Sequence, residues 1–248
     1  MTETGVLARI DELEGSLRQD QRLFDRAEEL LTRSAMLYRV IGATVETARV
    51  LLNMGYVFFF RGMPDQAIEI TRTALEEIPA DTEPRLYLNG RHNLALYLAE
   101  SGQYDEAADA LDTDEDLYRR FPEPTQLRLA WLRGKIAAGR GEAEAAERSL
   151  LAARDGFLGL GIGYDAAMVS LDLALVYLRQ ERSAEILRLA EEMFPIFESQ
   201  DVHREAIAAL RLFQEAARRE EVTADLVRDL AVYFREARRD PSLRFREG

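Results

Sequence analysis

Apolar positions along the chain recur at the spacing of an α-helix. In the stretch RHNLALYLAESGQYDEAADAL, residues 91–111, Leu94 and Leu98 lie four positions apart, as do Ala107 and Leu111 after a short turn. Side chains four apart share one face of a helix. The alternation typical of strands is missing from the sequence. The pattern therefore predicts an all-α chain of short helices joined by tight turns.

The predicted helices repeat with a period of about 40 residues. A small residue opens the second helix of each pair, at Ala27, Ala67, Ala107 and Ala146, with the larger Ile186 next in the series. Aromatic residues near the ends of the second helices form another column, Tyr38, Tyr118, Phe157 and Phe197, with Ile78 in the vacant position. Small residues in the first helices form a third column, Gly15, Gly55, Ala95, Gly134 and Ala174. We expect two helices to approach closely wherever such a side chain is small.

Proline and glycine mark the helix ends. Pro64 and Pro84 stand at expected helix starts, and Gly102 stands just after an expected end. These boundaries give five helix pairs and a sixth, more divergent pair after Val202. We expect one domain over residues 1–248, in which residues 202–248 form a divergent C-terminal repeat or cap. Each pair has a face that it cannot cover alone, so neighbouring pairs are expected to stack.

Two stretches resemble a known repeat. Residues 53–79, NMGYVFFFRGMPDQAIEITRTALEEIP, keep the glycine, aromatic, alanine and terminal proline pattern of the tetratricopeptide repeat (TPR) family, and residues 93–111 match nearly as well. The resemblance covers about residues 8–200. Because the period exceeds the usual 34 residues, the chain is similar to the long-repeat branch, which includes kinesin light chains and bacterial peptide-sensing regulators. The resemblance implies a right-handed α-solenoid of about six stacked helical hairpins, whose first helices line a concave groove.

Residues one repeat apart on the first helices should form columns down such a groove. The candidate site residues are Arg49, Asn53, Tyr56, Asn89, His92, Asn93, Arg128, Trp131, Lys135 and Asp172. A side-chain amide both donates and accepts, so Asn53 and Asn93 can hold an extended peptide backbone, and asparagine at this register often contacts peptide in the TPR family. The guanidinium group of an arginine can bind a carboxylate through two parallel hydrogen bonds, and exposed aromatic rings can anchor a partner.

Each of these residue types also has a structural interpretation. An asparagine at this register can bond the neighbouring repeat, and arginines can be solvated helix surface. Trp131 can serve packing, because large aromatic side chains usually bury most of their area. At least one ring of the run Phe58–Phe60 is expected to face the core, since three exposed rings would form an aggregation-prone patch.

Composition excludes several classes of protein. Hydrophobic residues make up 47% of the chain, which is ample for a continuous core. A net charge of −13 disfavours nucleic-acid and anionic membrane surfaces, and no segment approaches the ~20 apolar residues needed to span a bilayer. The chain has no cysteine, which fits a reducing compartment. We expect a cytoplasmic protein.

The sequence carries little catalytic chemistry. Its two histidines, His92 and His203, fall in different repeats, so no base is predicted beside a nucleophile. No histidine pair has metal-ligand spacing. The glycines of GLGIGYD, residues 159–165, follow no strand and precede no lysine, so they are interpreted as helix-end residues. We expect a protein that is not an enzyme and has no cofactor and no metal.

Two functions remain open. The leading hypothesis is a scaffold whose groove holds another protein or an extended peptide carrying acidic groups. The alternative is a self-associating regulatory or assembly module, forming a homodimer or acting through its terminal repeats on a separately encoded signalling partner. Terminal repeats normally need a polar outer face, and the short lead before the first repeat leaves a minimal N-terminal cap.

Overall fold

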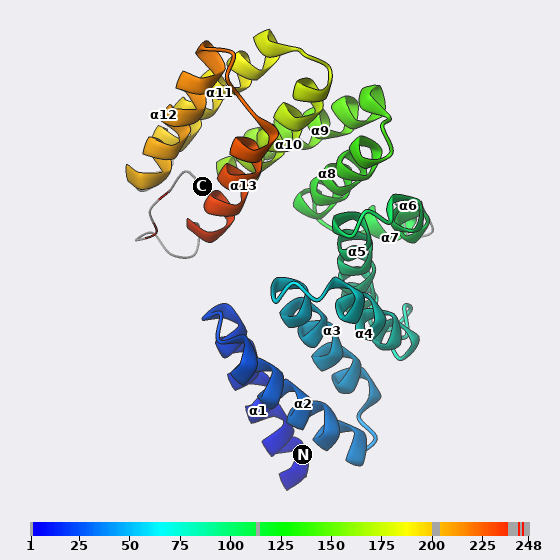
Figure 1. Cartoon of the computed structure of the whole chain (residues 1–248). Helices are drawn as coiled ribbons and strands as arrows, with labels where there is room; N and C mark the ends of the chain where they lie inside the picture. Colours follow the sequence, from blue (N-terminus) through cyan, green and yellow to red (C-terminus); the bar gives the residue numbers. More distant parts are fainter. Residues whose placement is uncertain (1, 113–114, 200–203, 238–242, 244, 246–248) are drawn as a thin grey trace. The chain divides into compact units, whose positions relative to one another are not determined.

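The structure is a computed structural model that describes residues 2–112, 115–199, 204–237, 243 and 245. The regular structure of these residues is helical throughout (Figure 1). The chain divides into two compact units, Met1–Phe121 and Pro122–Gly248.

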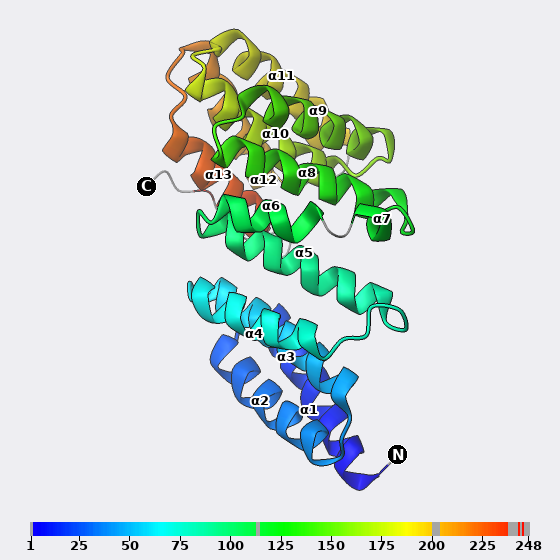
Figure 2. The same ribbon diagram turned by 90° about the vertical axis from the view of Figure 1, so that its right-hand side faces the viewer.

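Helices α1 to α6 of unit 1 form three helical hairpins, which can be followed in Figure 2. They pair α1 (Glu3–Asp20) with α2 (Phe24–Val40), α3 (Thr44–Phe60) with α4 (Pro64–Glu76), and α5 (Pro84–Glu100) with α6 (Tyr104–Asp112); a single turn, α7 (Glu115–Tyr118), follows. Each helix from α1 to α5 packs on the next one in the sequence. The hairpins therefore stack in chain order.

Unit 2 contains three further hairpins. Their helices are α8 (Glu123–Gly139), α9 (Ala143–Gly159), α10 (Gly163–Arg179), α11 (Ser183–Ser199), α12 (Arg204–Arg218) and α13 (Ala224–Ala237). Helices α8 to α12 again pack in chain order. The predicted fold class, an all-α array of about six stacked helical hairpins, is confirmed.

The columns read from the sequence explain the stacking. All five residues that open the second helices are buried, as are Tyr38, Ile78, Tyr118 and Phe157; the side chain of Phe197 lies outside the described residues. A Cβ atom on Gly55 would lie 2.6 Å from the Thr71 hydroxyl oxygen, and one on Gly134 would lie 2.6 Å from Leu150 Cγ. The expected close approach of the two helices in these hairpins is confirmed.

Tight turns separate the helices. Gly62, Gly102 and Gly141 follow first helices with φ between 77° and 78°, in the left-handed region that glycine adopts without steric cost. Arg22 takes the same turn position in the first hairpin with φ 58°. A left-handed backbone conformation is uncommon for any residue other than glycine. Arg22 also places a cationic side chain at the C-terminal end of α1.

Helix α13 departs from the stacking order of unit 2. It packs more extensively on α10 than on its own hairpin partner α12, and Figure 1 shows it beside α10. Its buried residues Val227, Leu230 and Phe234 recur at helical spacing on one face. This apolar face joins the core of unit 2. The last described helix therefore lies on a first helix instead of extending the stack.

Candidate functional site

A row of polar side chains follows the first helices of unit 1. Asn53 on α3 is half-buried, and its amide nitrogen donates to the Ser16 hydroxyl on α1 over 3.5 Å. Asn93 is half-buried at the equivalent position of α5, and Asn89 is exposed one turn earlier. An amide group offers two donor hydrogens and an acceptor oxygen, so the long bond to Ser16 uses only part of the hydrogen-bonding capacity of Asn53. We call Ser16, Asn53, Asn89 and Asn93 the amide row.

Arg49 is occupied by a buried carboxylate. Its Nε and Nη2 donate to the two carboxylate oxygens of Glu12 over 2.6 and 3.0 Å. Arg9 and the Tyr38 hydroxyl donate to the same carboxylate. Burial raises the pKa of Glu12, but the hydrogen bonds from Arg49 and Arg9 outweigh it, and the resulting pKa lies below the ordinary value. Arg49 thus ties α3 to α1, which makes it a positioning residue for the amide row.

Aromatic rings border the amide row. The rings of Tyr56 and Phe60 lie 4.3 Å apart, and Phe59 stacks on Tyr97 of α5 at 4.6 Å. The Arg22 guanidinium lies 5.4 Å from the centre of the Phe60 ring, within cation–π range. Tyr56, Phe59 and Phe60 are half-buried. We call Tyr56, Phe59, Phe60 and Tyr97, together with Arg22, the aromatic cluster.

Tyr97 is an unusual member of this cluster. Its side chain is buried, and its hydroxyl has no hydrogen-bond partner among the residues that the structure describes. Burial raises the pKa of this phenol well above the usual value. A buried hydroxyl without a partner is destabilising. Tyr97 follows Asn93 by one helical turn, so this polar atom belongs to the helix that carries the second amide.

His92 is held by a buried phenol. Its Nδ1 atom lies 3.0 Å from the hydroxyl oxygen of Tyr118, and Tyr118 belongs to α7, which packs on α5. This pair links the two helices inside unit 1. His203, the second histidine of the sequence, lies outside the described residues.

In unit 2 the structure brings two candidate residues together. Trp131 on α8 donates its indole N–H to Asp172 on α10 over 2.6 Å. Its ring lies nearly perpendicular to that of Phe157, with ring centres 6.2 Å apart. Trp131 is half-buried. The packing interpretation of this tryptophan therefore agrees with the geometry, and the Trp131–Asp172 bond joins neighbouring hairpins.

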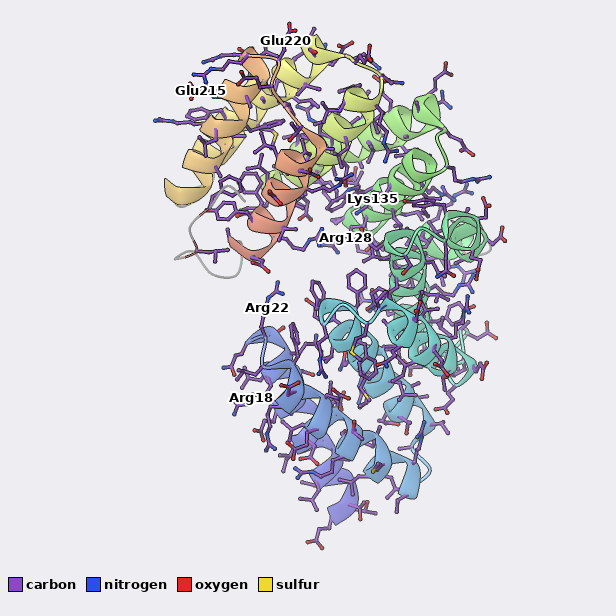
Figure 3. All side chains as sticks on the ribbon, viewed as in Figure 1. Arg18, Arg22, Arg128, Lys135, Glu215 and Glu220 are labelled. Atoms are coloured by element: carbon purple, nitrogen blue, oxygen red, sulfur yellow. The ribbon has the colours of Figure 1, made fainter. Side chains whose placement is uncertain are left out.

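The two basic candidates of unit 2 both extend from α8 (Figure 3). Arg128 is exposed, and its Nη2 lies 3.9 Å from a carboxylate oxygen of the buried Asp165. Lys135 is half-buried two turns further along the helix. The candidate residue Asp172 lies on α10, the helix on which α13 packs. Its neighbour Leu171 is buried.

The residues that the structure describes contain no group of three or more His, Cys, Asp or Glu side chains placed to hold a metal ion. No helix formed by the same residues has the length and apolar character needed to cross a membrane.

Comparison with known proteins identifies the fold. No protein-family model matches the sequence, and no curated protein sequence matches it. Among solved structures, a Rap protein complexed with competence and sporulation factor is similar, with a TM-score of 0.72 at 12% sequence identity. The match covers 94% of this chain and 65% of the Rap chain. Together with the repeating hairpins, this likeness supports TPR-like helical repeats.

Sequence reasoning missed three residues that shape the candidate site. Glu12 gave no signal because it stands in the acidic run Asp11–Glu14, which resembles solvated helix surface. Tyr97 lies at the register of the apolar Val57, so its pattern indicates core. Arg22 occupies a turn position where the other hairpins of unit 1 have glycine, and this break in the column was a signal available in the sequence.

Proposed function

We propose that this chain is a non-enzymatic binding scaffold that holds an extended segment of another protein on the amide row of unit 1. The supporting observation is a pair of half-buried asparagines, Asn53 and Asn93, one repeat apart beside the aromatic cluster. An extended backbone presents N–H and C=O groups in alternation, and side-chain amides satisfy both. Such a surface binds peptides largely independently of their side chains.

Each part of the surface has a distinct role in this proposal. Asn53 and Asn93 hold the peptide backbone, while Asn89 and His92 extend the same face. Tyr56 supplies an aromatic anchor of the kind that dominates interface energetics. Arg49 positions the row through Glu12. The preference for acidic segments is assigned to Arg22, whose guanidinium lies over Phe60.

Unit 2 contributes separately in the proposal. Arg128 and Lys135 extend from α8 and form a basic pair suited to acidic groups of a partner. Trp131 and Asp172 hold α8 and α10 in register through their hydrogen bond. The basic pair is expected to add affinity, and the indole–carboxylate bond is expected to keep the helices aligned.

Three broader observations support a binding scaffold. The fold resembles that of a Rap protein crystallised with competence and sporulation factor. The period of about 40 residues favours the long-repeat bacterial type, for which a cytoplasmic location is proposed. The net charge of −13 opposes nucleic-acid binding.

A peptide library tests this proposal. Random peptides displayed on phage are selected on the full chain, and the dissociation constants of the selected peptides are measured by calorimetry. The double variant Asn53→Ala/Asn93→Ala should weaken binding at least about tenfold, since removing hydrogen bonds to a buried backbone is expected to cost about 1–3 kcal/mol. Gln66→Ala, an exposed amide on the second helix α4, is the matched control. Unchanged affinity in the double variant would contradict the proposal.

A further inference from the structure

Exposed apolar side chains concentrate in the first hairpin. Among the described residues, nine of the twelve large apolar side chains that are exposed lie between positions 6 and 41. Four of them follow one face of α1 and are 42 to 54% exposed: Val6, Ile10, Leu13 and Leu17. Single exposed apolar residues are ordinary, but a contiguous row on one helix indicates an interaction surface. We call this row the α1 stripe.

The repeat period identifies the residues of α3 that are equivalent to the α1 stripe. Adding 40 to the positions of Ile10 and Leu17 gives Val50 and Val57 on α3. Val50 and Val57 are both fully buried, whereas Ile10 and Leu17 are 51 and 50% exposed. These two positions of the repeat are therefore core in the second hairpin and surface in the first, while Val6 and Leu13 correspond to the half-buried polar residues Glu46 and Asn53.

The third hairpin shows which neighbour covers this register. The equivalent residues of α5 are Gly90 and Tyr97. A Cβ atom on Gly90 would lie 3.2 Å from Leu52 on α3, and Tyr97 stacks on Phe59 of the same helix. This face of a first helix is thus turned toward the preceding hairpin. In α1 the same face remains exposed.

We propose that a second copy of this chain covers the α1 stripe, and that the two α1 helices pair in parallel as a symmetric dimer. The stripe has the 4-3-4 spacing of a heptad seam, with Val6 and Leu13 at d positions and Ile10 and Leu17 at a positions. The central pair of the stripe, Ile10 at a and Leu13 at d, is the combination that favours two parallel strands.

Charges beside the stripe determine the orientation. Arg9 precedes Ile10 at a g position and Glu14 follows Leu13 at an e position, and both side chains reach solvent. In a parallel pair, g of one helix faces e of the other five residues later. Arg9 of each copy therefore meets Glu14 of the other, while Arg9 keeps its ion pair with Glu12 and Glu14 keeps its ion pair with Arg18 within the same chain. Antiparallel pairing would place g beside g and e beside e, which separates these opposite charges.

Head-to-tail stacking of copies fits the structure less well. It requires an apolar face on the last hairpin that complements the α1 stripe. Among the described residues of α12 and α13, the exposed large apolar side chains are Leu212 and Val232, on different helices. Helix α13 is also packed on α10. A self-complementary stripe instead gives a closed dimer with two-fold symmetry.

Sedimentation equilibrium of the full chain over about 1 to 100 µM tests the dimer. The wild type should dimerise, and Ile10→Glu should raise the dimer dissociation constant at least about a hundredfold, because a buried charge lacks a partner there. Val232→Glu, an equally exposed valine on α13, is the control and should leave the dimer intact. A monomeric wild type, or a dimer that survives Ile10→Glu, would overturn the proposal.

Disulfide trapping tests the parallel orientation. The chain has no cysteine, so Leu13→Cys introduces a single thiol at a d position that meets its own copy only in a parallel pair. Mild oxidation should convert most of this variant to a covalent dimer, and Val232→Cys should remain largely uncoupled. Coupling that is no faster at position 13 than at position 232 would overturn the parallel arrangement.

Discussion

Two first helices of equal length, α5 in unit 1 and α10 in unit 2, differ in what covers them. Of the 17 residues in each helix, seven are buried in α5 and twelve in α10. In unit 2, α13 packs on α10, whereas α5 carries the half-buried Asn93 and the exposed Asn89. The comparison shows that the same repeat can provide a polar face in one unit and a platform for the chain's own last helix in the other.

Under the proposed function, this difference gives the two units separate tasks. A helix that receives another helix needs apolar side chains, and α10 has Leu171 beside Asp172 as part of the unit 2 core. A surface that receives an extended segment needs hydrogen-bonding groups, and the amide row of unit 1 supplies them. Stability and recognition should therefore respond to different substitutions.

Removing the apolar anchor of α13 should have the largest effect. Phe234 is fully buried, and Phe234→Ala is expected to lower the free energy of unfolding of unit 2 by about 3–5 kcal/mol. Trp131 is the sole tryptophan, so its fluorescence during urea unfolding reports on unit 2. Hydrogen exchange of α3 amides should stay unchanged. A loss below about 1 kcal/mol would mean that α13 is only loosely attached to α10.

Neutralising Glu12 should have the next largest effect, confined to unit 1. Glu12→Gln is expected to cost about 2 kcal/mol at neutral pH, because Arg9 and Arg49 lose a buried ionic acceptor. The folded-state pKa of Glu12 is lowered, so its contribution is present above the unfolded pKa of about 4.3 and disappears as pH falls through the folded value.

The pH dependence provides the measurement for this variant. The free energy of unfolding of wild type and of Glu12→Gln is measured in urea between about pH 7 and pH 3, with hydrogen exchange of the α1 and α3 amides as the readout for unit 1. The difference between the two proteins should shrink as the pH falls. A difference that stays constant over this range would contradict the ionic origin of the stabilisation.

A smaller effect is expected from the bond between Trp131 and Asp172. Asp172→Asn keeps an acceptor oxygen but removes the charge, so the indole N–H bond weakens and unit 2 should lose about 1 kcal/mol. Tryptophan fluorescence in urea measures both the stability and the environment of the ring. An unchanged midpoint would show that the ring is fixed by its packing on Phe157 alone.

The smallest stability effect is expected at the amide row. Asn53→Ala/Asn93→Ala should change the free energy of unfolding by no more than about 0.5 kcal/mol per site, because both side chains are only half-buried. Thermal unfolding followed by circular dichroism measures this. A loss of several kcal/mol would indicate that the asparagines serve the fold, and it would weaken their assignment to binding.

Much of the fold could be predicted from sequence because it rests on local rules. The 40-residue columns of small and apolar residues locate the hairpins, and the structure confirms the close approach at Gly55 and Gly134. The packing of α13 on α10 could not be read from the period, since the apolar spacing of Val227, Leu230 and Phe234 suits either partner helix.

The candidate site was less predictable. Its residue types could be located on first helices, but their partners depend on long-range packing. From the sequence, Arg49 was expected to bind carboxylates of a partner. In the structure its guanidinium instead donates to Glu12, 37 positions away. Trp131 and Asp172 were placed in different columns, and a hydrogen bond joins them across 41 positions. Such pairs form only when neighbouring repeats stack.

The most direct test of the binding account is a cross-linking map of a peptide selected from the random library. The peptide carries a photoreactive group at its centre, and mass spectrometry locates the cross-linked residues on the full chain. The account predicts cross-links on α3 and α5, near Asn53, Tyr56 and Asn93. Cross-links confined to the second helices α2, α4 and α6, or to α13, would contradict it.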